Sequence, residues 1–361
     1  MNDHTNRTAA RAEFLKRAGW GDAIAHPLAG DASTRRYERL TRGDAQAVLM
    51  IAPPGAEEPA CPPDASPAAR RALGYNALAR LAGPNLNAFT ALARTLRGAG
   101  LSAPDIYADD PHAGFVLIED LGDDLFARVA TQQNQDALYR AAMDALIALR
   151  AAAPERPHTD SYVLMEYDEA ALAAEAALLA DWYWPFRKGA PMADELKTEL
   201  ARLWAALLAR LEPPHCLVLR DYHAENLLWL PKRQGVKRVG VIDFQDALYG
   251  SPAYDVVSLL EDARRDVAPA FAEAMRGYYV ERAADLGGFS AEIFERDYAI
   301  LAAQRNAKIL GIFARLANRD GKTHYLDFIP RVEGLFRRDL DRPGLEDLKA
   351  FFVRHLKDLA P

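Results

Sequence analysis

Three short apolar segments interrupt the helical second half of this chain, and they constrain its fold more than any other feature. They cover Cys216–Leu219, Leu227–Leu230 and Val239–Ile242, and each is too short for a stable helix but suited to a buried strand. Polar residues fill the connection 220–226, and Asp243 follows the third segment directly. We therefore expect a small β unit, set among helices, that presents polar side chains at the ends of its strands.

The rest of the chain divides into a strand-rich first third and a helix-rich remainder. Strands are expected at residues 37–40, 46–52 and 113–119, with a hairpin turn at 41–44. Apolar spacing predicts helices at 8–18, 70–81, 86–98, 135–152, 169–179, 195–211, 255–262, 268–286, 293–315 and 345–359. This order is typical of an α+β protein with two lobes, which we place at residues 1–120 and 121–361.

The overall charge and the cysteine content argue against several classes of partner and site. The 361 residues carry a formal net charge of −7, which disfavours nucleic acid and anionic membrane surfaces. Cys61 and Cys216 have neither a metal-binding spacing nor the density of a disulfide framework. The start of the chain lacks the apolar core of a signal peptide, and no apolar run reaches the roughly 18 residues of a membrane span. A cytoplasmic protein is expected.

The polar residues of the β unit fit phosphoryl transfer. Asp221 and Asn226 lie in the connection between the first two segments, and Asp243 follows the third. This reaction needs a carboxylate near the acceptor hydroxyl and oxygen ligands for Mg²⁺ at the nucleotide phosphates. An Asp and an Asn separated by four residues can supply one of each from a single loop, and the second Asp can complete the metal site.

This pattern resembles the catalytic loop and metal-binding acid of kinases. With His223 two residues after Asp221, it is similar to the aminoglycoside-phosphotransferase superfamily rather than to protein kinases. The resemblance implies a protein-kinase-like fold of two lobes and the cofactors ATP and Mg²⁺. It implies Asp221 as the catalytic base, with Asn226 and Asp243 as Mg²⁺ ligands. Asp255 would then cap a helix or brace the backbone of the catalytic loop.

The resemblance places the nucleotide site in the first third of the chain. A loop there lies where the family covers the phosphates, which implies contacts from Gly30, Asp31, Ser33, Thr34, Arg35 and Arg36. Glu119 and Leu121 fall at the hinge whose backbone would pair with adenine. Met50 stands where the family usually has a phosphate-binding Lys, and the helix 86–98 has no Glu to pair with such a Lys. We hypothesise that Arg35 or Arg36 meets the phosphates instead.

Several longer stretches of the sequence resemble a narrower group of proteins within this superfamily. These stretches are residues 30–37, 243–247, 254–266, 310–315 and 319–322. They are similar to bacterial kinases of N-acetylmuramate and N-acetylglucosamine. Members of that family phosphorylate the anomeric C1 hydroxyl with ATP in peptidoglycan recycling, and the sugar 1-phosphate passes to a uridylyltransferase. By position, the amino-sugar substrate would be bound by Glu175, Tyr183, His223, Asp262, Arg264 and Arg265, with Arg305 and Lys308 as further candidates. Arginine suits a carboxylate such as the lactyl group of N-acetylmuramate.

Two alternatives stay open at this point. A kinase of the same fold could act on an aminoglycoside, choline or an amino alcohol, although Arg264 and Arg265 disfavour a cationic acceptor. The missing Lys and Glu could instead mark an inactive nucleotide-binding module, against which the intact Asp221, Asn226 and Asp243 argue. The sequence leaves open the choice between the two sugars and between ATP and GTP, and a monomer is expected.

Overall fold

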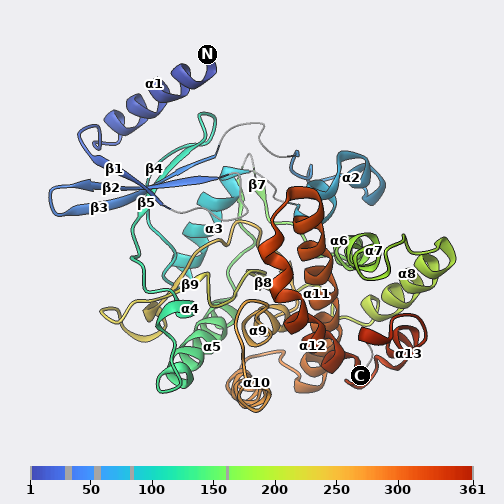
Figure 1. Ribbon diagram of the computed structural model, residues 1–361. Coiled ribbons are helices and arrows are strands. Elements are labelled where there is room, and N and C mark those ends of the chain that lie inside the picture. The colour runs from blue at the N-terminus through green and yellow to red at the C-terminus, as the bar shows by residue number, and fades with distance from the viewer. Residues whose placement is uncertain (1, 29–34, 53–57, 82–84, 160–161, 360–361) are drawn as a thin grey trace.

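The computed structural model describes residues 2–28, 35–52, 58–81, 85–159 and 162–359. Figure 1 shows a part built on a sheet, nearest the N-terminus, and a larger, mainly helical part. This arrangement confirms the predicted α+β fold with two lobes. The predicted boundary after residue 120 follows β5 (Phe115–Glu119) and stays a prediction, because η1 (Asn76–Arg80) of the first part packs against α6 (Glu169–Leu178) of the second.

The first part contains a five-stranded antiparallel sheet in the order β1-β2-β3-β5-β4. Its other strands are β1 (Ile24–Leu28), β2 (Arg36–Arg42), β3 (Ala45–Ile51) and β4 (Ile106–Asp110). Gly43 has a φ of +56° in the turn between β2 and β3, a backbone conformation that favours glycine. The sequence predicted β2, β3 and β5, but not the edge strands β1 and β4.

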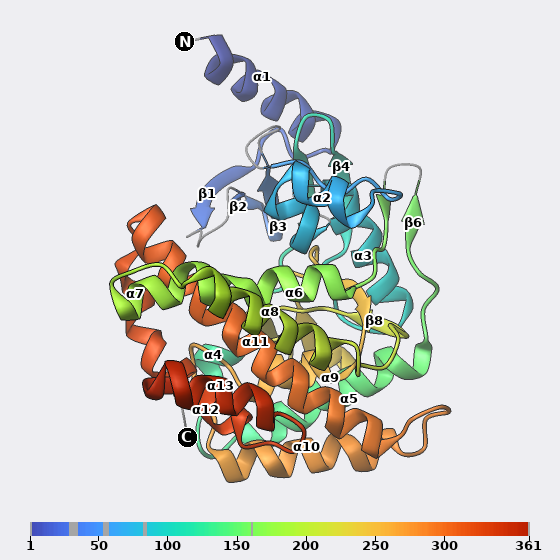
Figure 2. The ribbon, with the colours of Figure 1, turned by 90° about the vertical axis from the view of Figure 1, so that its right-hand side faces the viewer.

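Alternate residues of β3 point to opposite faces of this sheet. Ala47 and Leu49 are buried in one cluster with Phe14 of α1 (Asn2–Arg17). Val48 and Met50 are buried in a second cluster that contains α3 (Leu86–Gly98). The sheet therefore lies between α1 and α3, as Figures 1 and 2 show. Met50 is fully buried, so the position at which the kinase resemblance leads us to expect a lysine belongs to the hydrophobic core.

The second part consists of helices around two short hairpins. The hairpins pair β9 (Leu227–Trp229) with β10 (Val239–Val241), and β8 (Cys216–Val218) with β11 (Leu248–Gly250). The helices are α4 (Phe126–Val129), α5 (Gln135–Ala152), α7 (Trp184–Lys188), α8 (Asp194–Leu208), α9 (Ala253–Leu260), α10 (Pro269–Ala283), α11 (Ala291–Asp320), α12 (Ile329–Leu340) and α13 (Glu346–His355). Shorter elements are α2 (Pro67–Leu73), η2 (Leu179–Tyr183), β6 (His158–Thr159), β7 (Tyr162–Val163), η3 (Gly235–Arg238), η4 (Thr323–Phe328) and η5 (Lys357–Leu359).

The long helix α11 crosses the second part and packs against α6, η2, α9 and α12 (Figure 2). Its Gly311 lies against the end of α6, where an added Cβ would stand 2.3 Å from the carbonyl carbon of Leu178. Real Cβ atoms do not approach a backbone this closely, so the two helices can pack here only because residue 311 is glycine.

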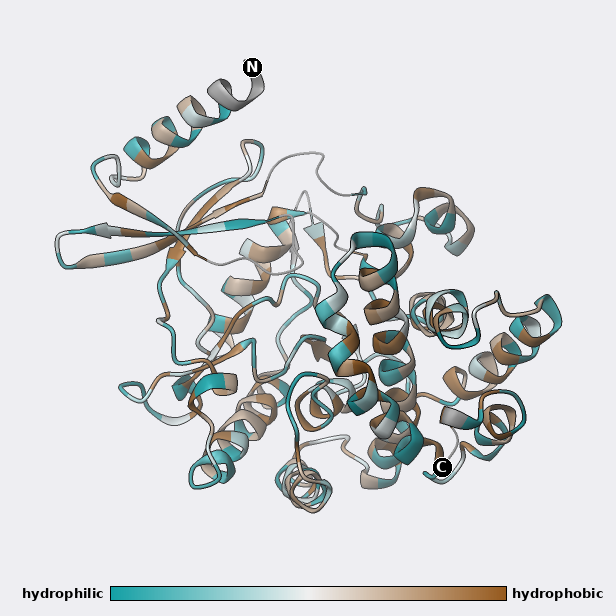
Figure 3. Cartoon of the chain, viewed as in Figure 1, coloured by the Kyte–Doolittle hydropathy of each residue, from teal (hydrophilic) through white to brown (hydrophobic). Residues whose placement is uncertain are grey.

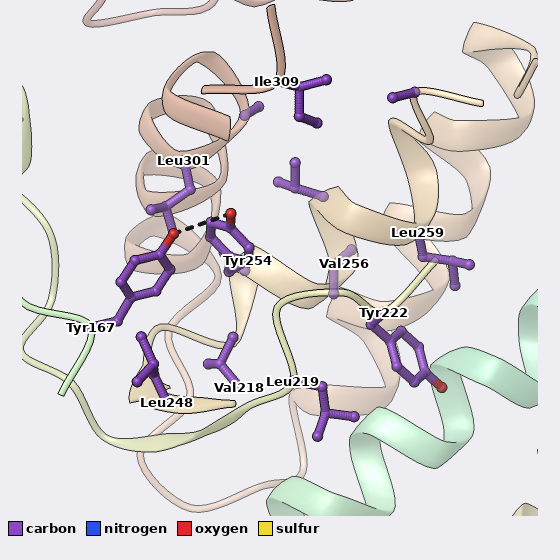
Figure 4. Packing of buried hydrophobic residues seen from close by; sticks show 14 of the residues in the cluster. Tyr167, Val218, Leu219, Tyr222, Leu248, Tyr254, Val256, Leu259, Leu301 and Ile309 are labelled. Atoms are coloured by element: carbon purple, nitrogen blue, oxygen red, sulfur yellow. Dashed lines mark hydrogen bonds between the residues drawn. The ribbon is translucent and has the colours of Figure 1, made fainter. Parts of the chain in front are cut away.

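Apolar side chains fill the space beneath the short hairpins. Figure 4 shows Val218, Leu248 and Val256 in this core, close to Tyr167 and Tyr254, whose hydroxyl groups form a hydrogen bond of 3.2 Å. Figure 3 shows that the helices around this core carry both hydrophobic and hydrophilic residues, as expected for helices with one buried face. Within the described ranges, no helix combines the length and the apolar character needed to cross a membrane.

Candidate active site

The predicted catalytic loop, residues 220–226, connects β8 to β9. Arg220 has a φ of +68°, which is uncommon for a residue with a side chain and turns the chain sharply. The carboxylate of Asp255, in the first turn of α9, accepts hydrogen bonds of 2.8 Å from the backbone N–H groups of Leu219 and Arg220. Asp255 is 2% exposed, and burial raises its pKa to about 7. This side chain therefore braces the backbone immediately before Asp221.

The contacts of its nitrogen orient the side-chain amide of Asn226 and leave its oxygen available to a ligand. Nδ2 donates to the backbone carbonyl of Asp221 at 3.0 Å and lies 3.4 Å from Nε2 of His223. An amide nitrogen can only donate, so these two acceptors fix the orientation of the group. The N–H of Ile242 donates to the backbone carbonyl of Asn226 at 3.0 Å and ties this residue to the end of β10. Oδ1 is thus the atom that Asn226 can offer to a metal ion.

Asp243 follows Ile242 and therefore lies next to Asn226 at the end of the β9–β10 pair. Nε2 of Gln245 donates to one of its carboxylate oxygens at 2.6 Å. Burial, and then the charge of Asp221, raise the pKa of Asp243, and a bound cation would favour its ionised form. No three His, Cys, Asp or Glu side chains among the described residues are grouped to hold a metal ion. Phosphate and water oxygens would have to complete the coordination of Mg²⁺ here.

The charges around Asp221 keep its carboxyl group ionised. Burial acts to raise the pKa of Asp221, but the positive charges of Lys308 and Arg220 contribute to an opposing effect that outweighs it. The pKa therefore lies below its ordinary value. Nζ of Lys308 is 2.9 Å from a carboxylate oxygen of Glu175, and Arg220 forms an ion pair with the same carboxylate. Asp221 is thus held as a carboxylate that can accept a proton.

A cavity of about 100 Å³ adjoins Asp221. It lies between the catalytic loop, the end of α9 and one face of α11. Three predicted acceptor residues line it, His223, Asp262 and Arg264, together with Arg305 and Lys308 of α11. The structure therefore brings together residues that lie up to 92 positions apart in the sequence, from Asp221 to Phe313.

Three predicted acceptor residues lie away from this cavity, which corrects our expectation for their side chains. Glu175 is fully buried behind it. Tyr183 is also fully buried, in η2, and its hydroxyl donates to Glu333 at 2.5 Å. The guanidinium of Arg265 donates to two backbone carbonyls near α4 and lines a separate hollow of about 800 Å³. Burial removes Glu175 and Tyr183 from contact with an acceptor, and Arg265 faces a different hollow from Asp221.

On the sheet side of the site, Arg35 is the better placed of the two predicted phosphate contacts. Its side chain is 4% exposed, and its positive charge opposes the rise in the pKa of Asp243. Arg36, at the start of β2, is exposed. The other predicted contacts of this loop, Gly30, Asp31, Ser33 and Thr34, lie outside the described residues.

The predicted hinge follows the central strand β5. Glu119 is the last residue of β5, and its carboxylate accepts hydrogen bonds from the guanidinium of Arg233 and from the N–H of Asp105. Leu121 lies two residues further on, with its side chain next to Gly240 of β10. Both side chains contact the protein, and the backbone of this segment stays the part predicted to meet a nucleotide base.

The apolar wall of the cavity is the part that the sequence analysis missed. Ala263, Ile309, Ile312 and Phe313 form it. Residues 305, 308, 309 and 312 follow the spacing of one helix face, so the sequence did contain a signal once Arg305 and Lys308 were suspected. A second unpredicted feature is the ion pair of 3.0 Å between Arg80 of η1 and Asp246, three residues after Asp243.

Known proteins are similar to this chain along most of its length. Residues 24–288 match the phosphotransferase enzyme family. An N-acetylmuramate/N-acetylglucosamine kinase of Caulobacter vibrioides is 45% identical over 361 residues, which cover 99% of this chain and 98% of the relative. A kinase with the same name from Pseudomonas aeruginosa is 35% identical over 326 residues, covering 88% of this chain and 85% of the relative.

Solved structures show the same fold at low sequence identity. One is a thermostable mutant of an aminoglycoside phosphotransferase in a ternary complex with ADP and hygromycin B. It superimposes with a TM-score of 0.53 at 13% identity, covering 92% of this chain and 99% of that chain. At this identity the likeness supports the predicted kinase-like fold and says nothing about the acceptor.

Proposed function

Because this chain belongs to the phosphotransferase enzyme family, we propose that it is an ATP- and Mg²⁺-dependent kinase of N-acetylmuramate and N-acetylglucosamine. The anomeric C1 hydroxyl is the proposed acceptor. The observation that carries the proposal is the 45% identity, over almost the whole chain, to a kinase named for these two sugars. The grouping of Asp221, Asn226 and Asp243 at the ends of neighbouring strands supports it.

In this mechanism Asp221 accepts the proton of the acceptor hydroxyl. Asp255 holds the backbone before Asp221 in place, and the low pKa of Asp221 keeps the carboxylate ionised until the hydroxyl proton arrives. An anomeric hydroxyl is more acidic than the other sugar hydroxyls, so a weak base suffices. Transfer by an in-line route then depends mainly on position and charge.

Asn226 and Asp243 would hold Mg²⁺, which supplies positive charge at the phosphate oxygens when bound. The free direction of the Asn226 oxygen and the raised pKa of Asp243 support this assignment. Arg35 would add a positive charge on the sheet side, where Met50 replaces the usual lysine. The ADP complex of a protein with the same fold supports the binding of a nucleotide.

Several finer points remain predictions from the family resemblance. They are a role in peptidoglycan recycling, transfer of the sugar 1-phosphate to a uridylyltransferase, a cytoplasmic location and a monomeric state. Acceptors such as choline or an aminoglycoside are disfavoured, because the cavity beside Asp221 contains the cations Arg264, Arg305 and Lys308.

The direct test uses phosphorus NMR. The protein is incubated with Mg-ATP and, in separate samples, N-acetylmuramate, N-acetylglucosamine, choline and kanamycin, with Asp221→Asn as the control. We expect an anomeric phosphate signal with both amino sugars and none with the variant. Phosphorylation of choline or kanamycin alone would overturn the acceptor assignment, and ATP binding without any turnover would support an inactive module instead.

A further inference from the structure

The side chain of His223 lines the cavity beside Asp221 and carries a hydrogen-bonding atom without a partner among the described residues. It is 7% exposed, and its Nδ1 has no hydrogen-bond partner among the described residues. Buried polar atoms in folded proteins nearly always have a partner, so an exception at a cavity wall points to a ligand. His223 is one of the residues that line this cavity.

The protonation of this imidazole follows from Asn226. Nδ2 of Asn226 donates to the Asp221 carbonyl and faces Nε2 of His223, so Nε2 has to act as an acceptor and carries no hydrogen. A neutral imidazole then carries its hydrogen on Nδ1. His223 therefore carries a neutral N–H donor without a described partner at the wall of the cavity.

The other walls of the cavity suit a small group with one polar and one apolar side. Ile309, Ile312 and Phe313 of α11 form an apolar surface, and Asp262 lies near His223. The Asp262 carboxylate accepts hydrogen bonds from the N–H groups of Ala224 and Arg264, at 3.2 and 2.8 Å, and keeps further acceptor capacity. A volume of about 100 Å³ fits a substituent of the acceptor rather than a whole sugar.

We propose that this cavity is a recognition site for the acetamido group at C2 of the acceptor. Nδ1–H of His223 donates to the acetyl carbonyl, Asp262 accepts from the amide N–H, and the apolar face of α11 receives the methyl group. The C2 substituent is adjacent to the C1 hydroxyl, so a sugar bound in this way brings C1 to Asp221. The inference rests on the proposed function. It adds that the protein recognises the acetamido group, which N-acetylmuramate and N-acetylglucosamine share.

The kinetic test compares N-acetylglucosamine with glucose, which has a hydroxyl in place of the acetamido group. The readout is the ratio of the two kcat/KM values for wild type, His223→Gln and His223→Asn. The amide nitrogen of Asn can stand near the position of Nδ1, whereas that of Gln stands near Nε2. We expect wild type to favour N-acetylglucosamine, His223→Gln to lower the ratio about tenfold, as for one lost hydrogen bond, and His223→Asn to keep most of it.

A uniform fall in kcat/KM for both sugars with His223→Gln would overturn the inference, because His223 would then act only through Asn226. An unchanged ratio, or equal use of both sugars by wild type, would also overturn it while the kinase assignment stands. If wild type phosphorylates no N-acetyl sugar, the proposed function and the inference both fall. The KM for ATP in each variant shows whether the metal site has been disturbed.

A second measurement does not depend on turnover. Saturation-transfer NMR of N-acetylglucosamine bound to the wild-type protein should give its strongest signal at the acetyl methyl protons, since these would lie against Ile309, Ile312 and Phe313. A stronger signal at the ring protons would contradict the proposed orientation.

Discussion

Replacement of Glu175 by Gln should strongly destabilise the folded chain. Glu175 is 0% exposed and balances two cations, Arg220 and Lys308, whose side chains are 4% and 12% exposed. Glutamine has nearly the same shape but no charge, so both cations would stay buried with their main counter-charge removed. Breaking a buried ion pair in this way costs about 3–5 kcal/mol. That is a large part of the roughly 5–15 kcal/mol that keeps a typical protein folded.

Urea unfolding followed by tryptophan fluorescence would measure this loss. Glu169→Gln is the matched control, because Glu169 is an exposed acid in the first turn of the same helix, and its loss should cost less than about 1 kcal/mol. Addition of Lys308→Met to Glu175→Gln removes one of the two cations and should recover part of the stability. If Glu175→Gln is no less stable than the control, the buried carboxylate does not balance these cations and the reasoning is wrong.

Four further predictions concern the site. Asp221→Asn should lower kcat about 10²–10⁴-fold in a coupled ADP assay with little change in the KM for ATP, as expected for loss of a general base. Asn226→Ala should raise the Mg²⁺ concentration needed for half-maximal rate, and an unchanged Mg²⁺ titration would exclude it as a ligand. Arg35→Ala should raise the KM for ATP, while Arg36→Ala should resemble wild type because its side chain is exposed; wild-type values for both would reject Arg35 as the phosphate contact. Burial raises the pKa of Asp255 from 3.8 to about 7. Its contribution to stability is therefore fully present below the lower value and is lost as the pH rises through the upper one. Urea unfolding should show a loss of stability between about pH 4 and about pH 7 that Asp255→Asn lacks.

Local patterns in the sequence predicted most of the elements. The helices α3 and α5 have the predicted bounds, because their apolar residues repeat at helical spacing and each ends near a glycine or alanine run. The strands β1 and β4 were missed, since they lie at the sheet edges and carry only exposed or half-buried residues. The helix α12 was also missed, although its buried residues face α11. The two missed strands lack the buried positions from which a local pattern is recognised, whereas α12 carries buried residues at helical spacing that the sequence analysis overlooked.

In the active site, too, local sequence patterns revealed some residues, while the roles of others depend on long-range packing. Asp221, Asn226 and Asp243 were found because they sit at strand ends within one short stretch of sequence. Glu175 and Tyr183 were expected to touch the acceptor, but the chain buries both, and only long-range packing decides that outcome. The structure supplied the hydrogen bonds that orient His223, the apolar wall on α11 and the link from Lys308 to Glu175.

Gly311 has a consequence for how this enzyme can change its acceptor during evolution. Because the backbone of α11 touches the end of α6 at that position, the helix cannot shift towards α6, and any larger residue would push it away. Arg305, Lys308, Ile309 and Ile312 stand on this same helix and line the cavity. A new acceptor preference is therefore expected to arise by exchange of these side chains on a fixed backbone. Variants at residue 311 should lose activity towards all acceptors together.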